Sequence, residues 1–173
     1  ENGVDCTLIE PHPEYFCQIE DKFKHYPNVK LHNLAIGPTN GEVSFFLHGS
    51  SSFLDVIDKP PTVTDGGYKK IFGRKTNIQS AVWDERFDNG KIDLLLLDME
   101  GSEIFVLSKL RSFPVILSVE THCENRYTNP SINEINQFVN RHHYKVLFRN
   151  TTDSFFIRDI TWGCGNNEGW NLG

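Results

Sequence analysis

The stretch that most constrains the fold is residues 91–110, KIDLLLLDMEGSEIFVLSKL, in which an apolar run leads into acidic residues and then into an amphipathic segment. The run 92–97 is short and continuously apolar, which predicts a buried parallel strand covered on both faces. Gly101 lets the chain turn, and the spacing of Ile104, Leu107 and Leu110 predicts a helix that packs back on the sheet. This order of elements is typical of an open α/β domain.

Two acidic residues, Asp98 and Glu100, come directly after that strand. Ligands of open α/β sheets bind outside the carboxyl ends of the strands, so acids at this position are well placed for binding or catalysis. The structural alternative is that they cap the following helix and interact with its N-terminal dipole. Glu103, in the first helical turn, has the same two interpretations.

Apolar spacing and turn residues predict the remaining elements. The predicted strands are 4–9, 29–36, 42–47, 76–80 and 114–119, followed by a hairpin of 144–148 and 154–157. Helices are predicted after Pro13, over 81–87, and after Ser131, where Ser131 to Glu134 has the form of a capping box. Asn40-Gly41 predicts a hairpin turn before 42–47.

Strands that alternate with helices predict one α/β domain over residues 1–173, with a mostly parallel sheet and an antiparallel hairpin at its C-terminal edge. Residues 48–75 contain Ser50-Ser51-Ser52, Pro60-Pro61 and Gly66-Gly67 and little periodicity, so a long loop is expected there. Tyr68, Phe72 and Trp83 offer flat surfaces for a sugar or ring, or belong to the local core.

The charge of the chain disfavours two classes of binding partner. The formal charge of −6 and the absence of clustered Lys and Arg disfavour nucleic acid and anionic membranes. No apolar run approaches the roughly twenty residues of a membrane span, and no signal peptide is recognisable, so a cytoplasmic domain is expected.

The four cysteines lack the spacing of a zinc site, which predicts free thiols. Cys123 and Cys164 are the pair that could form a disulfide in an oxidising compartment.

Three stretches occur in a particular order: LIEPHP at 8–13 with Phe16, LAIG at 34–37 followed by Gly41, and IDLLLLDMEGSE at 92–103 with Val106-Leu107. In that order they resemble elements of the FkbM family of S-adenosylmethionine-dependent O-methyltransferases, which has a Rossmann-like sheet. The resemblance implies that the chain uses S-adenosylmethionine to methylate a hydroxyl of a sugar or another small molecule.

The resemblance also implies cofactor-binding residues. Glu10, at a strand end, is expected to accept hydrogen bonds from the ribose hydroxyls. Asn33 and Ala35 are expected to line the adenine pocket, and Asp98 adjoins the cofactor. The structural alternatives are that Glu10 caps the next helix and that Asn33 and Ala35 pack within the sheet.

Methyl transfer needs a base for the acceptor proton, or a metal that meets the charge of the acceptor oxygen. Asp98 and Glu100 at one strand end, and Glu120 and His122 at the next, offer both chemistries. His122 is the best single candidate for the base, because an imidazole titrates near neutrality. A divalent ion on Asp98 and Glu120 is an alternative, but the spacing defines no ligand set and no metal site is predicted.

The chain departs from the family pattern in two places. Leu96 stands where the family has Lys, and the first strand and helix, with the glycine-rich turn that receives the methionine part of the cofactor, are not found ahead of Glu1. We therefore expect an N-terminally incomplete methyltransferase fold, and three explanations stay open. The sequence is a piece of a longer polypeptide, or 163–169 is a displaced glycine loop, or the domain has lost cofactor binding.

These explanations leave two alternative functions. A domain without cofactor binding would be a non-catalytic module for assembly or recognition within a larger protein. A dehydrogenase would use Glu10 on the ribose of another nucleotide, but no glycine fingerprint precedes that residue. If the chain is a methyltransferase, the loop 48–75 is expected to act as a lid that selects the acceptor. The acceptor itself and the oligomeric state do not follow from the sequence.

Overall fold

The computed structural model of the chain describes residues 3–57, 74–122 and 128–159. Its helices are α1 (Pro13–Phe23), α3 (Ile104–Leu107) and α4 (Ile132–Arg141). Its strands are β1 (Cys6–Ile9), β2 (Val29–His32), β3 (Ala35–Ile36), β4 (Gly41–Leu47), β5 (Phe53–Leu54), β6 (Arg74–Ala81), β7 (Leu94–Leu97), β8 (Ile116–Glu120), β9 (Tyr144–Arg149) and β10 (Asp153–Arg158). The domain is therefore mixed α/β, as the sequence predicts.

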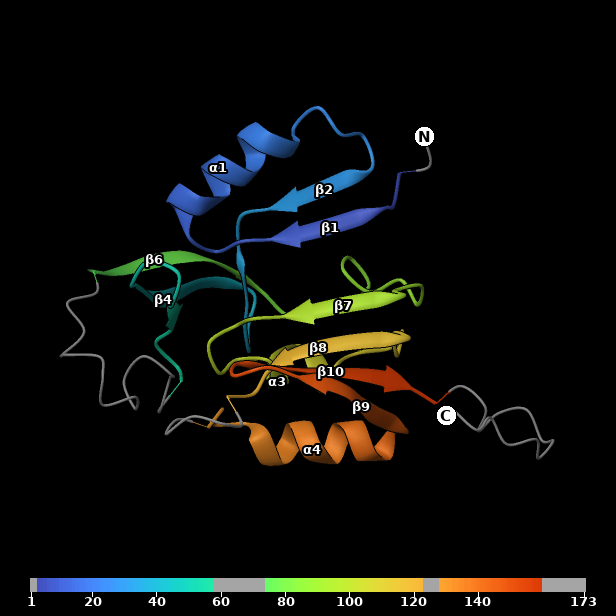
Figure 1. The fold of residues 1–173 in the computed structure, drawn as a ribbon. Coiled ribbons are helices and arrows are strands. Elements are labelled where there is room, and N and C mark those ends of the chain that lie inside the picture. Colours follow the sequence, from blue (N-terminus) through green and yellow to red (C-terminus); the bar gives the residue numbers. More distant parts are fainter. Residues whose placement is uncertain (1–2, 58–73, 123–127, 160–173) are drawn as a thin grey trace, which may run out of the picture.

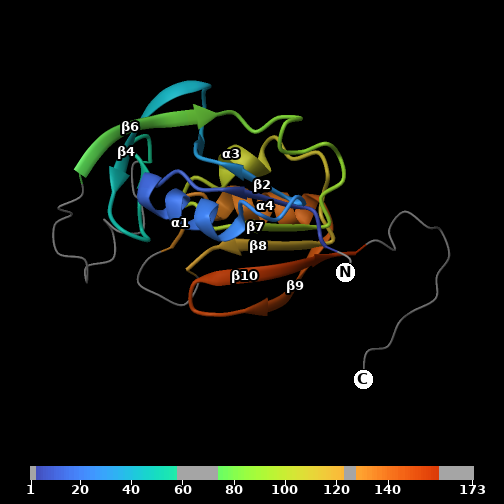
Figure 2. The same cartoon turned by 90° about the horizontal axis from the view of Figure 1, so that it is seen from above.

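The strands form three hydrogen-bonded groups, in the orders β1-β2, β7-β8-β10-β9 and β3-β6-β4-β5. Figure 1 shows β2, β1, β7, β8 and β10 following one another down the molecule, with α1 at the top and α4 at the bottom. Seen from above, β4 and β6 lie to one side of β7, β8 and β10 (Figure 2).

The pairing is mixed, which corrects the prediction of a mostly parallel sheet. Three pairs are parallel, namely β1 with β2, β7 with β8, and β3 with β6. The pairs of β4 with β5 and β6, and of β10 with β8 and β9, are antiparallel. The predicted C-terminal hairpin is confirmed as β9 and β10. The difference arises because β4, β5 and β6 also form an antiparallel group, so antiparallel pairing is not confined to the C-terminal edge.

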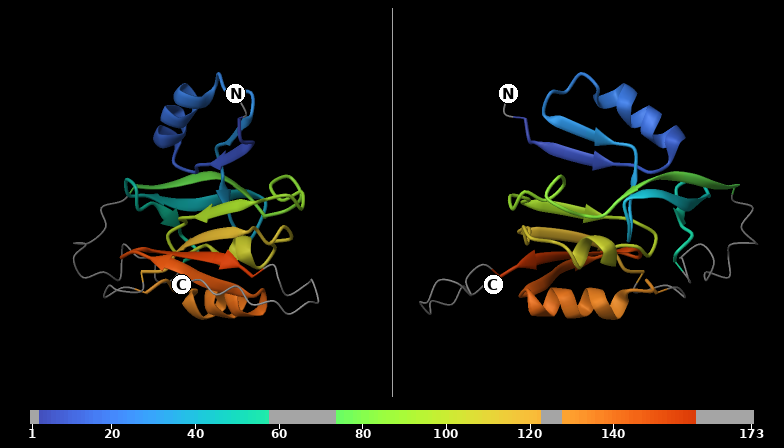
Figure 3. Two further views of the ribbon diagram at one scale, coloured as in Figure 1. Left: turned by 45° about the vertical axis from the view of Figure 1, so that its right-hand side comes forward. Right: turned by 180° about the vertical axis from the view of Figure 1, so that it is seen from behind.

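β1 and β7 point in the same direction, and in Figures 1 and 3 the gap between them is wider than the gap between the paired strands β1 and β2. Among the described residues, no ladder of hydrogen bonds joins them. Leu94 and Leu96 of β7 are 56% and 63% exposed, whereas Leu97 is buried in the core. The prediction of a strand covered on both faces is therefore wrong, because no described element packs over the face that carries Leu94 and Leu96.

Two clusters of apolar side chains form the core. The larger one surrounds β8 and includes Leu107 of α3, Leu117 and Val119 of β8, and Ile135 of α4. Phe138 and Val139 are buried as well, so α4 packs one apolar face into this cluster. The smaller cluster contains Ala35, Phe45, Leu54 and Ile78. The helix α1 has no fully buried residue, so its apolar face is only partly covered.

The region around β3, β4 and β6 differs most from the sequence prediction. The predicted strand 29–36 is split into β2 and β3, which belong to different groups. β6 lies between β3 and β4, with Ser80 opposite both Ala35 and Gly41, so the predicted Asn40-Gly41 hairpin does not pair its two flanking strands. Instead, the side-chain Oδ1 of Asn40 accepts a hydrogen bond from the Val82 N–H at 3.0 Å.

Two local predictions are also corrected. Residues 82–87 form an extended segment and a turn rather than a helix, and the N–H groups of Phe87 and Asp88 both donate to the Asp84 carbonyl. The side chain of Ser131 makes no capping hydrogen bond to α4. The neighbouring Asn129 takes the equivalent role, because its Oδ1 accepts the Ser131 N–H at 2.9 Å.

The predictions for the cysteines, the long loop and the C-terminal glycine segment concern residues that the structure describes only in part. Cys6 and Cys17 are free thiols, and Cys123 and Cys164 lie outside the described residues. The predicted loop contains the short strand β5, and 58–73 lie outside the description, as does the glycine-containing segment 163–169. None of the helices in the described ranges has the length and apolar character that a membrane span requires.

Candidate functional site

The carboxyl ends of β7 and β8 bring three acidic side chains together. β7 and β8 are parallel with Leu97 opposite Val119, so Asp98 and Glu120, which follow these positions, lie at the same edge of the sheet. Asp98, Glu100 and Glu120 each place a carboxylate oxygen within 4.8 Å of the other two. Asp98 is open to solvent, whereas Glu100 and Glu120 are buried.

The loop after β7 turns sharply and directs Glu100 into this cluster. Glu100 has a φ of 52° and Gly101 a φ of 98°, so two consecutive residues have left-handed backbone angles. Such angles are unfavourable for residues other than glycine and persist where the surroundings impose them. A Cβ atom on Gly101 would come within 2.9 Å of Pro130 Cγ. Glycine is therefore required at this position for two separate reasons.

The side chain of Glu103 anchors this loop through hydrogen bonds. Its side chain is 0% exposed, and its Oε1 accepts the N–H groups of Met99 at 3.0 Å and Gly101 at 3.3 Å. Its Oε2 accepts a hydrogen bond from the Asn129 side-chain amide at 2.8 Å. The same amide donates to the Glu120 carbonyl at 2.7 Å. Glu103 and Asn129 therefore link the end of β7 to the end of β8.

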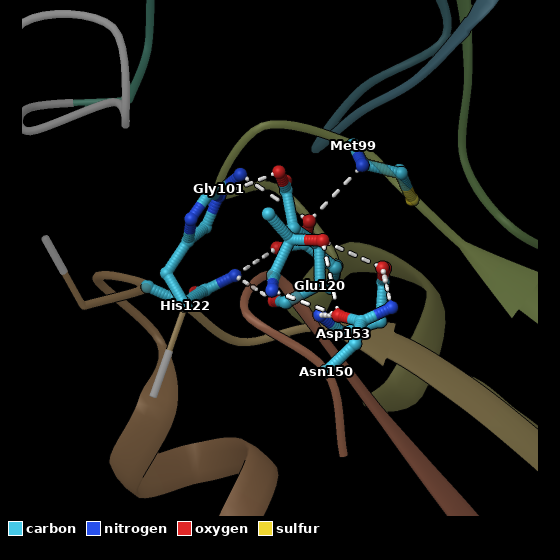
Figure 4. A network of polar contacts seen from close by, with 9 residues as sticks. Met99, Gly101, Glu120, His122, Asn150 and Asp153 are labelled. Carbon is cyan, nitrogen blue, oxygen red and sulfur yellow. Dashed lines mark hydrogen bonds and ion pairs between the residues drawn. The ribbon is translucent and has the colours of Figure 1, made fainter. Parts of the chain in front are cut away.

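His122 contacts the cluster through Glu120. Its Nε2 lies 2.6 Å from Glu120 Oε1, and His122 has a φ of 50°. Figure 4 shows Glu120 close to His122, with Met99 and Gly101 on one side of the network and Asn150 and Asp153 on the other. The carbonyl of Thr152 accepts the N–H groups of both Thr121 and His122 at 2.7 Å, which holds the chain after β8 in place.

Burial and mutual repulsion favour the protonated form of the carboxyl groups in this cluster. Burial raises the pKa of Glu100 to about 7, and the Asp98 carboxylate adds to the rise. Burial likewise raises the pKa of Glu120 to about 9, and four carboxylates of the same charge contribute: Glu100, Asp98, Glu103 and Asp153. Desolvation raises the pKa of Asp98, with a further contribution from Asp153, while His122 lowers it.

These shifts predict how stability depends on pH. A carboxyl group whose pKa is raised by folding stabilises the fold below its unfolded pKa, and that contribution is lost as pH rises through the folded value. With a chelator present, the free energy of unfolding should fall as pH rises from about 4.5 to about 9. Each group contributes at most about 1.4 kcal/mol per pH unit. Urea unfolding at several pH values measures this dependence.

Matched variants assign the pH dependence to the cluster. Glu100→Gln should reduce the slope between about pH 4.5 and 7, because the titration of Glu100 is removed while that of Glu120 remains. Glu134→Gln, at an exposed position on α4, should leave the slope unchanged. A wild-type stability that is level or rising over this range would contradict the assignment.

Glu10 and Asn33 lie at the neighbouring strand end. Glu10 follows β1, is half-buried, and its Oε1 accepts the His12 N–H at 2.7 Å. Burial raises the pKa of Glu10, and Asp98 is close enough to raise it further, whereas the His12 N–H lowers it. The amide of Asn33 donates to the Glu10 carbonyl at 2.8 Å. Glu10 and the Asp98 cluster thus share one edge of the domain.

Other candidate residues lie elsewhere or outside the description. Ala35 is buried in the smaller apolar cluster, away from solvent. Trp83 is buried in the larger cluster and stacks on Phe87, with ring centroids 5.6 Å apart. Tyr68 and Phe72 lie outside the described residues. The functional roles proposed for Glu10, Asn33, Ala35, Asp98, Glu100 and His122 stay predictions.

Sequence analysis does not identify Asn129 or Ser51 as members of this region. Asn129 is buried and connects three segments. An Asn before Pro at the start of a helix is typical of a side-chain turn, so Asn129-Pro130 carries a usable signal. Ser51 donates a hydrogen bond to Glu100 from the loop before β5. Nothing local in the sequence pairs Ser51 with that carboxylate.

A family model described as "Methyltransferase FkbM domain" matches residues 2–146, which is most of the chain. Searches of curated proteins and of solved structures found no significant match. The matched range includes Glu10, Asp98, Glu100, Glu120 and His122.

Proposed function

Because the chain belongs to the FkbM methyltransferase family, we propose that it is an S-adenosylmethionine-dependent O-methyltransferase that acts on a hydroxyl of a sugar or another small molecule. One observation carries the proposal beyond family membership. The half-buried carboxylate of Glu10 lies at the same edge of the domain as the cluster of Asp98, Glu100 and Glu120. Asp98 is close enough to raise the pKa of Glu10. This edge is where α/β sheets bind nucleotides.

The residues present fit the ribose part of the cofactor. Glu10 is partly desolvated, and within the described part of the chain only its Oε1 receives a hydrogen bond. Ribose hydroxyls would supply donors that this carboxylate lacks. Ala35, Asp98 and Asn33, which is anchored to the Glu10 backbone, complete the cofactor-binding set in our proposal. The described residues offer no glycine-rich turn for the methionine part.

The catalytic part of the proposal concerns the acceptor. S-adenosylmethionine supplies a methyl group that leaves sulfur as the acceptor oxygen bonds to it, giving S-adenosylhomocysteine and one proton. The chain must hold the acceptor hydroxyl and take that proton. We assign the proton to His122, oriented by Glu120 at 2.6 Å. Asp98 and Glu100 border the acceptor.

Within the described ranges, β1 and β7 each have one edge that pairs with no other strand. The exposed face of Leu94 and Leu96 is apolar, which favours a covering element. We propose that a further strand and helix, carrying the glycine-rich turn, fill this position in the working protein. A strand between two parallel strands would hydrogen-bond to both of them and would satisfy their free backbone groups.

Calorimetric titration of S-adenosylhomocysteine tests the proposal. The titration is made into the chain and into a version extended upstream wherever its gene encodes further residues. We expect tighter binding to the extended form, and Glu10→Gln in that form should weaken binding about 10- to 100-fold, the range for lost hydrogen bonds to a charged group. Glu14→Gln, an exposed acid on α1, is the matched control and should bind as the unmodified protein does.

The alternative function makes the opposite prediction. The open edges of β1 and β7 also suit a non-catalytic module that assembles with another segment. Absence of S-adenosylhomocysteine binding to every form would favour that module and would overturn the enzyme proposal. Unchanged affinity in Glu10→Gln would remove Glu10 from the cofactor site.

A further inference from the structure

We propose that Asp98, Glu100 and Glu120 bind one divalent cation through their carboxylate oxygens. One oxygen from each residue lies within 4.8 Å of the other two. Oxygen ligands stand about 2.0 to 2.6 Å from Mg²⁺ or Ca²⁺, so ligands on opposite sides of one ion are about 4 to 5 Å apart. The three oxygens therefore already have the spacing of ligands that share an ion.

A second observation concerns the other oxygen of Glu120. Its Oε2 is buried and has no hydrogen-bond partner in the described part of the chain, although the residue is only 6% exposed. Leaving a buried polar atom without a partner costs free energy, and more so for a charged group. The charged groups that act on Glu120 most strongly are carboxylates, which repel it: Glu100, Asp98, Glu103 and Asp153. A bound cation would supply the missing partner.

The cluster also lacks charge compensation from the protein. In the described ranges, Lys and Arg side chains form ion pairs with other acids, and none pairs with Asp98, Glu100 or Glu120. His122 contacts Glu120 through one ring nitrogen and neutralises charge only when protonated. Buried charges in proteins are normally paired or coordinate metals. Because Asp98 is open to solvent, an ion has a route into the site.

The ligand set indicates the class of ion. Three carboxylates without a thiolate are typical of hard cations such as Mg²⁺, Mn²⁺ and Ca²⁺ rather than Zn²⁺ or Cu²⁺. Three protein ligands leave coordination positions for water or for another oxygen. Within the proposed function, on which this role alone rests, that oxygen is the acceptor hydroxyl, whose pKa the cation would lower. The binding of the cation itself does not depend on the function.

Mn²⁺ titration of the chelator-treated, dialysed chain at pH 8 tests the site, with free Mn²⁺ measured by electron paramagnetic resonance. We expect saturable binding of one Mn²⁺ per chain, with Mg²⁺ or Ca²⁺ competing. Asp98→Asn should weaken Mn²⁺ binding at least about 10-fold, because one charged ligand is lost. Since Asp98 is exposed, this variant should keep its circular dichroism spectrum. Glu120→Gln is a second variant with the same expected loss.

Glu134→Gln is the matched control, because it removes the same charge from an exposed position on α4. It should bind Mn²⁺ as the unmodified chain does. The proposal is overturned by equal Mn²⁺ affinity in Asp98→Asn and the unmodified chain, by equal weakening in Glu134→Gln, or by no saturation up to on the order of 10 mM. The titration contains no nucleotide, so its failure is separate from a failure of S-adenosylhomocysteine binding.

Discussion

Replacing Glu103 with alanine should lower the free energy of unfolding by about 4 kcal/mol, within the range for breaking a buried charged network. The reason is that the substitution leaves three donors without their acceptor, namely the N–H groups of Met99 and Gly101 and the amide of Asn129. A buried unsatisfied donor costs about 1 to 3 kcal/mol. Such a loss is a large part of the 5 to 15 kcal/mol typical of a domain. Urea unfolding followed by circular dichroism measures it.

Two further variants isolate the cause. Glu103→Gln keeps the shape and one acceptor oxygen, but its new NH₂ group faces the Asn129 amide that donates to Glu103. Its cost should therefore be intermediate. Glu134→Ala, on the exposed face of α4, should change stability by less than about 0.5 kcal/mol. A loss below about 1 kcal/mol in Glu103→Ala would show that the loop after β7 does not depend on this carboxylate.

Replacing Gly101 with alanine should destabilise the domain by about 2 to 4 kcal/mol, through two added costs. The first is backbone strain, because a φ of 98° is unfavourable for a residue with a Cβ atom. The second is overpacking, since the new Cβ would approach Pro130 Cγ to 2.9 Å and Ile57 Cγ2 to 3.2 Å. The same urea experiment measures the loss.

Gly90 provides a matched control for the backbone cost. Its φ is 84°, and a Cβ atom there would meet nothing within 4 Å. Gly90→Ala should therefore cost about 1 kcal/mol, from strain without overpacking. The difference between the two variants reports the close approach at Gly101. Equal losses in both would contradict the packing argument.

Local patterns predicted some elements of the fold correctly. The apolar run ahead of Asp98 is a strand parallel to the next one, and the segment around Asn150 is a hairpin turn between β9 and β10. Pro13 begins α1, as its position at a helix start indicates. These features depend on neighbouring residues alone, so a single sequence carries the necessary information.

The sequence predicted which acids lie together in the candidate site, but it did not predict how they are buried and hydrogen-bonded. Asp98 and Glu120 end adjacent parallel strands, so the strand pattern places them at one edge of the sheet. The buried position of Glu103 and its bond to Asn129 did not follow from the sequence. An acid in the first turn of a helix fits both a surface cap and a buried acceptor, and only the three-dimensional contacts distinguish them.

By itself, the sequence of this protein determined its family, the extended segments that end in acids, and the glycine that lets the chain turn, because motif order and residue spacing are local properties. Only the tertiary structure decided that β6 lies between β3 and β4, and that Leu94 is exposed. It also decided that Glu120 is buried among like charges. Strand partners and burial arise from contacts between residues far apart in the chain, which no local pattern records.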